Sequence, residues 1–171
     1  MATSTTSTTT VKDLQTLAQK ALTKQIEIIK NSPENSPVNL ANKALLNFDD
    51  STSVWAAGGT LEAGGLVYYG VSCTLALTNI TNVKAVEFDA HGWGAVAAAI
   101  ECEVAGAFVV DPSTVAGNCE WAIVAGAVEE GAVSLTLMTE SGSLIGTFAG
   151  VAEGIGAFTW GKDNGNLTVT G

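Results

Sequence analysis

The chain of 171 residues contains no arginine, and this shortage of cations excludes one class of partner. Residues 51–171 hold twelve of the 17 acidic residues but only two of the seven lysines, Lys84 and Lys162. The whole net charge of −10 therefore belongs to this part of the chain. Because such a surface repels phosphate groups, we expect no binding to nucleic acid.

The chain also has a single histidine, His91, and few groups that could perform chemistry. One histidine excludes a multi-histidine metal site, and no GxSxG motif or glycine-rich phosphate loop is present. The carboxylate pairs Glu87/Asp89 and Glu101/Glu103 have the two-residue spacing of the solvent-facing side of a strand. We therefore predict a protein that is not an enzyme, with no catalytic residue, no metal ligand and no cofactor.

Cysteine is also scarce, with Cys73, Cys102 and Cys119 as its three occurrences. An odd number without CxxC spacing does not form a disulfide framework. Each cysteine alternates in phase with apolar residues two positions away, which predicts buried structural thiols.

The N-terminal part differs from the rest in composition and in hydrophobic period. Residues 1–10 form a Ser/Thr-rich tail that we expect to be disordered, and residues 11–50 form a helical arm and linker. Within residues 11–30 the apolar residues fall on one helical face, and four lysines gather on the other: Lys12, Lys20, Lys24 and Lys30. Such a helix either docks on the remainder of the protein or on another copy, or it binds a lipid surface or a partner.

From residue 51 the apolar period becomes two, which predicts β-strands separated by short turns. Residues 71–78, VSCTLALT, show the alternation clearly, and turn sequences occur at 57–59, 91–92, 111–113 and 163–165. We count eight to ten strands in residues 51–171. The predicted fold is all-β: a small closed antiparallel β-barrel of about eight strands, preceded by the N-terminal amphipathic helix.

Residues 140–161, ESGSLIGTFAGVAEGIGAFTWG, repeat glycine every fourth residue, as packed membrane helices do. Two glutamates and the shortness of the apolar stretch exclude a spanning helix. We predict instead a Ser141-Gly142 turn, a strand over 144–149, a glycine corner and a strand over 155–160.

Four tryptophans are many for a domain with few other aromatic residues. Trp121 is in phase with apolar neighbours, which predicts a core position. Trp93 and Trp160 lie beside glycines, where a partly exposed ring could stack on a sugar or sit at a membrane interface. The alternative for both rings is packing in the core or at a barrel end.

Residues 133–150, VSLTLMTESGSLIGTFAG, resemble the C-terminal hairpin of the virulence-associated protein (Vap) family of actinobacterial pathogens. The matching positions are Ser141-Gly142, Leu144-Ile145-Gly146 and Ala149-Gly150, followed by Gly154, Gly156 and Gly161. The resemblance implies an eight-stranded antiparallel barrel without known catalytic residues that acts by interaction with a host or membrane component.

We therefore expect a non-enzymatic, Vap-like interaction protein that contacts a membrane surface or a host component. Trp93, Trp160, Lys12, Lys20, Lys24 and Lys30 are the candidate contact residues. The alternatives are a lectin-like barrel that binds a carbohydrate or another small ligand, and an oligomeric pore-forming or structural protein. The start, MATSTTSTTT, lacks the features of a signal peptide, so we expect a cytoplasmic protein or a secreted one whose signal has been removed.

Overall fold

The fold is known from a computed structural model that describes residues 55–65, 67–77, 82–93, 99–125, 132–152 and 158–171. For residues 124–125 and 158–163 it describes the backbone alone. The strands are β1 (Trp55–Gly64), β2 (Tyr68–Leu77), β3 (Ala85–Trp93), β4 (Ile100–Phe108), β5 (Gly117–Ala125), β6 (Ala132–Met138), β7 (Leu144–Val151) and β8 (Phe158–Thr170). A short 3-10 turn, η2 (Pro112–Thr114), lies between β4 and β5.

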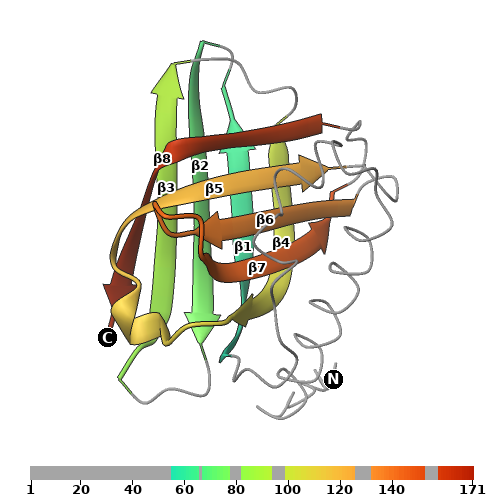
Figure 1. The fold of residues 1–171 in the computed structure, drawn as a ribbon. Helices are drawn as coiled ribbons and strands as arrows, with labels where there is room; N and C mark the ends of the chain where they lie inside the picture. The colour runs from blue at the N-terminus through green and yellow to red at the C-terminus, as the bar shows by residue number, and fades with distance from the viewer. Residues whose placement is uncertain (1–54, 66, 78–81, 94–98, 126–131, 153–157) are drawn as a thin grey trace, which may run out of the picture.

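The eight strands close into an antiparallel barrel in the order β1-β2-β3-β8-β5-β6-β7-β4. Figure 1 shows two groups: β1 to β4 run together, and β5 to β7 cross in front of them at a steep angle. The long strand β8 joins the groups, because residues 166–170 pair with β3 while residues 158–167 pair with β5. On the other side, β4 pairs with both β1 and β7 and completes the closure. The predicted closed antiparallel barrel is confirmed.

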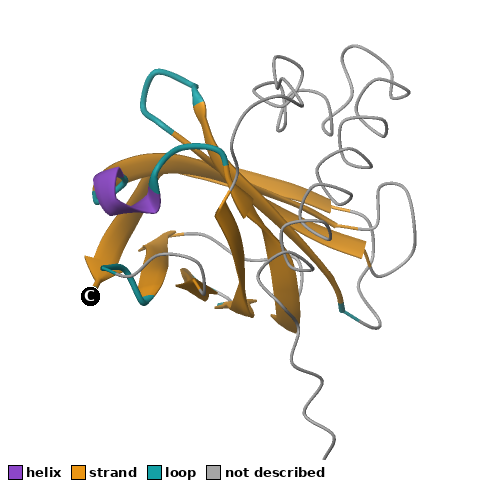
Figure 2. Cartoon of the chain, turned by 90° about the horizontal axis from the view of Figure 1, so that it is seen from below, coloured by secondary structure: helices purple, strands orange, loops and turns teal. Residues whose placement is uncertain are grey.

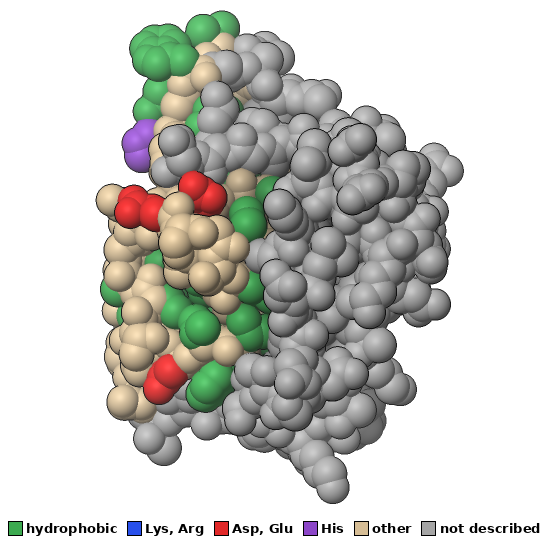
Figure 3. Space-filling view, viewed as in Figure 1, with side chains coloured by type: hydrophobic (Ala, Val, Ile, Leu, Met, Phe, Trp, Pro, Cys, Tyr) green, Lys and Arg blue, Asp and Glu red, His purple; other side chains and the backbone are tan. Residues whose placement is uncertain are grey.

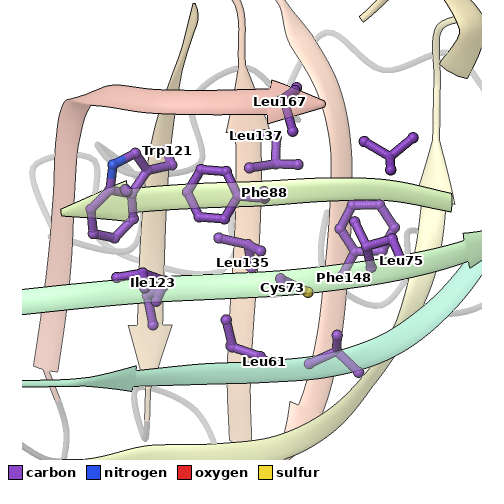
Figure 4. Close-up of a cluster of buried hydrophobic side chains, with 14 of the residues drawn as sticks. Leu61, Cys73, Leu75, Phe88, Trp121, Ile123, Leu135, Leu137, Phe148 and Leu167 are labelled. Carbon is purple, nitrogen blue, oxygen red and sulfur yellow. The ribbon is translucent and has the colours of Figure 1, made fainter. Parts of the chain in front are cut away.

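Two-residue alternation explains why these segments are strands and where the core lies. In β2 the side chains of Tyr69, Val71, Cys73, Leu75 and Leu77 are buried, and the residues between them face outward. The inward side chains fill the barrel as one cluster, and Trp121, Phe88 and Phe148 are among its largest groups (Figure 4). Burial of such side chains is worth about 1.5–3 kcal/mol each and dominates the stability of the fold.

The hairpin between β6 and β7 confirms the interpretation of the glycine-repeat segment as β-structure. The amide of Gly142 donates to the Thr139 carbonyl, and Gly142 has φ +87°, a value that glycine adopts without strain. Strand β7 begins at Leu144 as predicted and continues to Val151. Of the next predicted strand, over 155–160, residues 158–160 belong to β8, and its predicted start at Ile155 lies outside the described residues.

Several other predicted turns are wrong, but the turn at 111–113 is confirmed. Residues 57–59, 91–92 and 163–165 lie inside β1, β3 and β8, where glycine occupies a strand position in a strongly curved sheet. Asp111 does begin the turn at η2, where its carboxylate accepts a hydrogen bond from the Ser113 amide at 2.9 Å. Figure 2 shows this turn in purple near the C-terminus of the barrel.

The predicted N-terminal amphipathic helix, like the tail before it, lies outside the described residues. Within the described part of the chain, no helix has the length and apolar character needed to cross a bilayer.

Candidate functional site

Exposed aromatic side chains gather where β2 begins and β3 ends. Tyr68 and Trp93 are directly opposed across the two strands, and their rings meet edge to face with centroids 5.3 Å apart. Trp93 is 77% exposed and Tyr68 is 51% exposed. His91 lies two residues before Trp93, and its ring centroid is 5.9 Å from that of Tyr68. We call Tyr68, His91 and Trp93 the aromatic cluster.

A groove of about 630 Å³ lies beside the aromatic cluster on the outer face of β1 to β4. Gly64 and Gly70 are cross-strand partners in this groove, and a Cβ atom added to either would meet nothing within 4 Å. His91 also lines the groove and pairs with Gly70, so the cluster and the groove are continuous. The floor is therefore bare backbone, with an aromatic group on one side.

Carboxylates line the groove on the side away from Trp93. The strand register aligns Glu101, Glu62, Ser72 and Asp89 in one row across β4, β1, β2 and β3. Glu62 and Glu101 are directly opposed, an arrangement of like charges that is destabilising in a sheet. Figure 3 shows acidic side chains in red close to the purple histidine on this end of the molecule. The groove thus offers carboxylate oxygens as hydrogen-bond acceptors next to an aromatic surface.

The end of β3 that carries the aromatic cluster is fixed by the side chain of Asn164. Its amide nitrogen donates to the carbonyl oxygen of His91 at 2.5 Å and lies 2.9 Å from the Tyr69 hydroxyl. The indole nitrogen of Trp121 donates to the Asn164 side-chain oxygen at 3.4 Å. The backbone pairing of β3 with β8 runs from Asp89 back to Ala85, so Asn164 bridges the two strands beyond their ladder.

The three thiols lie inside the barrel and are free, as the sequence predicted. Burial raises the pKa of Cys73 to about 12, with a smaller contribution from Cys102, and burial alone raises the pKa of Cys119 to about 12. A thiol becomes nucleophilic only as the thiolate. These cysteines are therefore structural groups at neutral pH.

Of the candidate contact residues predicted from the sequence, the structure describes the side chain of one, Trp93. Trp93 is exposed in the aromatic cluster, so it does not pack in the core, whereas the alternative of packing at a barrel end is not tested. The side chains of Trp160, Lys12, Lys20, Lys24 and Lys30 lie outside those that the structure describes. His91 is exposed, and it belongs to a strand instead of the predicted turn at 91–92.

Sequence reasoning missed Tyr68 and Glu62 as members of this site. Tyr68 is in phase with the outward residues of the alternating segment that follows it, so the two-residue period could have placed it on the surface. No local signal shows that Glu62 lies opposite Glu101, because strand order and register bring the two together. In the described residues, no group of three or more His, Cys, Asp and Glu side chains could hold a metal ion.

No model of a known protein family matches the chain, and no curated protein matches it in sequence. Among solved structures, the chain is similar to the virulence-associated protein VapB from the intracellular pathogen Rhodococcus equi. The identity is 12% and the TM-score is 0.44, over 69% of this chain and 98% of that chain. This neighbour bears the name of the family that the sequence analysis named for residues 133–150.

Proposed function

We propose that this chain is a non-enzymatic interaction protein that binds its ligand on the outside of the barrel, at the aromatic cluster and the adjoining groove. The observation that carries the proposal is the exposure of Trp93, with Tyr68 against it, at the edge of an open groove. Large aromatic side chains supply much of the binding energy in protein interfaces. Two of them, Tyr68 and Trp93, are held here by paired strands of a closed barrel together with the ring of His91. The site is therefore largely ordered before the ligand binds.

The chemistry of the groove favours a neutral carbohydrate as the ligand. An aromatic ring packs against the apolar C–H face of a sugar, and the sugar hydroxyls can donate to the carboxylates of Glu62, Asp89 and Glu101. The glycine floor leaves space for a ring-shaped ligand. An anionic ligand would meet the same carboxylates and be repelled.

A membrane surface is the second candidate, favoured by the exposed apolar side chain of Val67 directly before Tyr68. Val67 is 69% exposed, and tryptophan and tyrosine are enriched where proteins meet the bilayer interface. Contact through this cluster suits a neutral membrane better than an anionic one, because of the neighbouring carboxylates. Contact of an anionic membrane with Lys12, Lys20, Lys24 and Lys30 remains a prediction from the sequence.

The proposal that the protein is not an enzyme is supported by the chemistry of its thiols. The strongest nucleophiles of the described residues, Cys73 and Cys119, are enclosed in the barrel with raised pKa values. The groove and the aromatic cluster instead offer carboxylate oxygens, which accept hydrogen bonds, and aromatic rings. These groups are suited to binding a ligand.

The test is binding of the full chain to an array of neutral glycans and to phosphatidylcholine vesicles. We expect glycan binding that Trp93→Ala reduces at least about tenfold, since anchor residues cost 2 kcal/mol or more when truncated. Val151→Ala is the matched control, because Val151 is a 71% exposed apolar residue that does not line the groove. Binding to vesicles alone would replace the carbohydrate with a membrane as the ligand. Binding to neither probe, or equal binding by both variants, would overturn the proposal.

A further inference from the structure

We propose that the ligand is a linear, neutral oligosaccharide that lies across β1 to β4, with its sugar rings over Gly70 and Gly64. This inference rests on the proposed function and adds the orientation and the length of the ligand. The bound chain begins at the aromatic cluster and runs toward β4, at right angles to the strands. We call the outward positions His91, Gly70, Gly64 and Ala99, one on each strand, the glycine row.

The fold does not require glycine at position 64 or at position 70. Neither residue has a positive φ, so other residues could adopt the same backbone conformation. A Cβ atom added at either position would meet no atom within 4 Å. Gly59 and Gly106 differ, because a Cβ atom there would collide with the carbonyl oxygen of a neighbouring strand. Glycine at positions 64 and 70 therefore leaves a space that the fold itself does not use.

A glycine inside a strand often marks a bulge, a sharp bend, or the close approach of a ligand or another backbone. The ladder between β1 and β2 keeps one register up to the pair Gly64–Gly70, which excludes a bulge there. Figure 1 shows β2 without the sharp corner that β8 makes. The empty space at both Cβ positions excludes the close approach of another backbone. The approach of a ligand is the use that remains.

The glycine row runs across the strands, and its length sets the length of the ligand. Gly70 pairs with His91 on one side and with Gly64 on the other, and the register of β1 and β4 places Ala99 beside Gly64. All four residues line the groove. With neighbouring strands about 4.8 Å apart, the row is about 14 Å long. Since one pyranose unit of an extended chain is close to this spacing in length, the row accommodates about three linked units.

Hydrogen-bond acceptors repeat beside the glycine row at the same spacing. Asp89, Ser72, Glu62 and Glu101 are successive cross-strand neighbours, one on each strand. The described residues that line the groove include no lysine. Each ring of an oligosaccharide carries hydroxyl donors, so successive rings can donate to acceptors on successive strands. A single ring reaches only part of this row, and the repeated acceptors therefore favour a chain of sugars.

The aromatic cluster fixes the end of the groove at which the ligand begins. Among the described residues, the exposed aromatic rings Tyr68 and Trp93 lie on β2 and β3. The first sugar ring packs against this cluster, and the following rings extend over Gly70 and Gly64 toward β4. Gly64 therefore contacts an oligosaccharide but not a monosaccharide bound at the cluster.

Titration of the full chain with cello-oligosaccharides, from glucose to cellohexaose, tests the inference through the NMR signal of the Trp93 indole N–H. We expect the affinity to rise at least about tenfold from glucose to cellotriose and then to level off, because longer chains extend beyond the row. Gly64→Val fills the row away from the aromatic cluster. It should lower the affinity for cellotriose about tenfold and leave that for glucose unchanged. Ala76→Val places the same side chain on an exposed position of β2 outside the groove and should change neither affinity.

The outcomes separate this inference from the proposed function. Equal affinities for glucose and cellotriose would overturn the inference while the aromatic cluster remains a sugar site. Wild-type affinity of Gly64→Val for cellotriose would overturn it in the same way. A Trp93 signal that no oligomer shifts would also overturn it, and the glycan array then decides the proposed function by itself. If Gly64→Val fails to fold, the dependence on ligand length in the wild type decides alone.

Discussion

Replacing Gly106 by alanine tests how closely the backbones of β4 and β7 approach each other. A Cβ atom at Gly106 would lie 2.0 Å from the carbonyl oxygen of Thr147 and 2.8 Å from the Cα atom of Phe148. Gly150 on β7 has the same relation to β4, with a Cβ position 2.1 Å from the Glu103 carbonyl oxygen. All three obstructing atoms belong to the backbone, so no side chain can rotate away to make room.

The expected cost follows from the displacement that the added methyl group requires. An ordinary contact needs 3.4 Å or more, so the strands must separate by more than 1 Å at the place where the barrel closes. Adding a methyl group to a packed site costs about 1–3 kcal/mol. We expect a cost at the upper end of that range, because the backbone hydrogen-bond ladder between β4 and β7 has to move. We expect Gly106→Ala to lower the free energy of unfolding by about 3 kcal/mol and Tm by about 10 °C.

Gly70→Ala is the matched control, because its Cβ atom would meet nothing within 4 Å. Alanine restricts the unfolded chain more than glycine does, so this variant should be unchanged or more stable by about 0.5 kcal/mol. Urea unfolding followed by tryptophan emission measures both variants. Equal stabilities for Gly106→Ala and the wild type would refute the close approach of β4 and β7.

Two further predictions concern the barrel interior and the support of the site. Because the pKa values of Cys73 and Cys119 are raised to about 12, ionisation favours the unfolded state above pH 9. Ionisation of the thiols should therefore not change the free energy of unfolding below pH 9. As the pH rises from 9 toward 12, it should lower this free energy by up to about 1.4 kcal/mol per pH unit for each thiol. Urea titrations of the wild type and Cys73→Ala at pH 8 and pH 10 measure the difference, and identical pH slopes would contradict the assignment. Asn164→Ala removes the side-chain bridge to Tyr69 and should cost about 1 kcal/mol, whereas Asn166→Ala, on an exposed position of β8, should cost little. Thermal unfolding of these two variants decides this prediction, and equal losses would contradict it.

The sequence predicted the barrel well because its strands alternate strictly. Segments such as 71–78 and 133–137 place apolar residues in a two-residue period, and the same period identified the three buried thiols and the core position of Trp121. The number of strands followed from turn chemistry where a true turn exists, as at Ser141-Gly142 and Asp111-Pro112. The prediction that residues 140–161 form strands and not a spanning helix holds for the described part of that segment.

Glycine within a curved sheet is the reason that other turn assignments failed. A glycine pair or an Asn-Gly pair usually marks a turn, but Gly58, Gly59 and Gly165 occupy strand positions, and neighbouring atoms lie close to Gly59 and Gly165. A local pattern does not distinguish these two uses of glycine. Whether a glycine forms a turn or lies inside a strand depends on which strand is its neighbour. The order of all strands in the barrel decides this neighbour.

The site was predicted in part, because its residues come from four strands. Trp93 was predicted as a candidate contact residue because it lies beside glycines. Its pairing with Tyr68 and the alignment of the carboxylates in one row depend on the strand register, which the sequence does not show. The burial of outward-directed polar side chains in β6 and β7 could not be predicted for the same reason. Thr136 and Thr147 look like ordinary solvent-facing residues in the sequence, and their burial becomes visible only in the folded chain.

The most direct test of the proposed ligand site is tryptophan emission of the full chain during titration with a library of neutral oligosaccharides. Trp93 is exposed to water while Trp121 is buried, so a ligand that covers the aromatic cluster should shift the emission of Trp93 to shorter wavelength. We predict a saturable shift in the wild type and in Val151→Ala that is absent in Trp93→Phe. A flat response in the wild type, or a shift that persists in Trp93→Phe, would contradict the account.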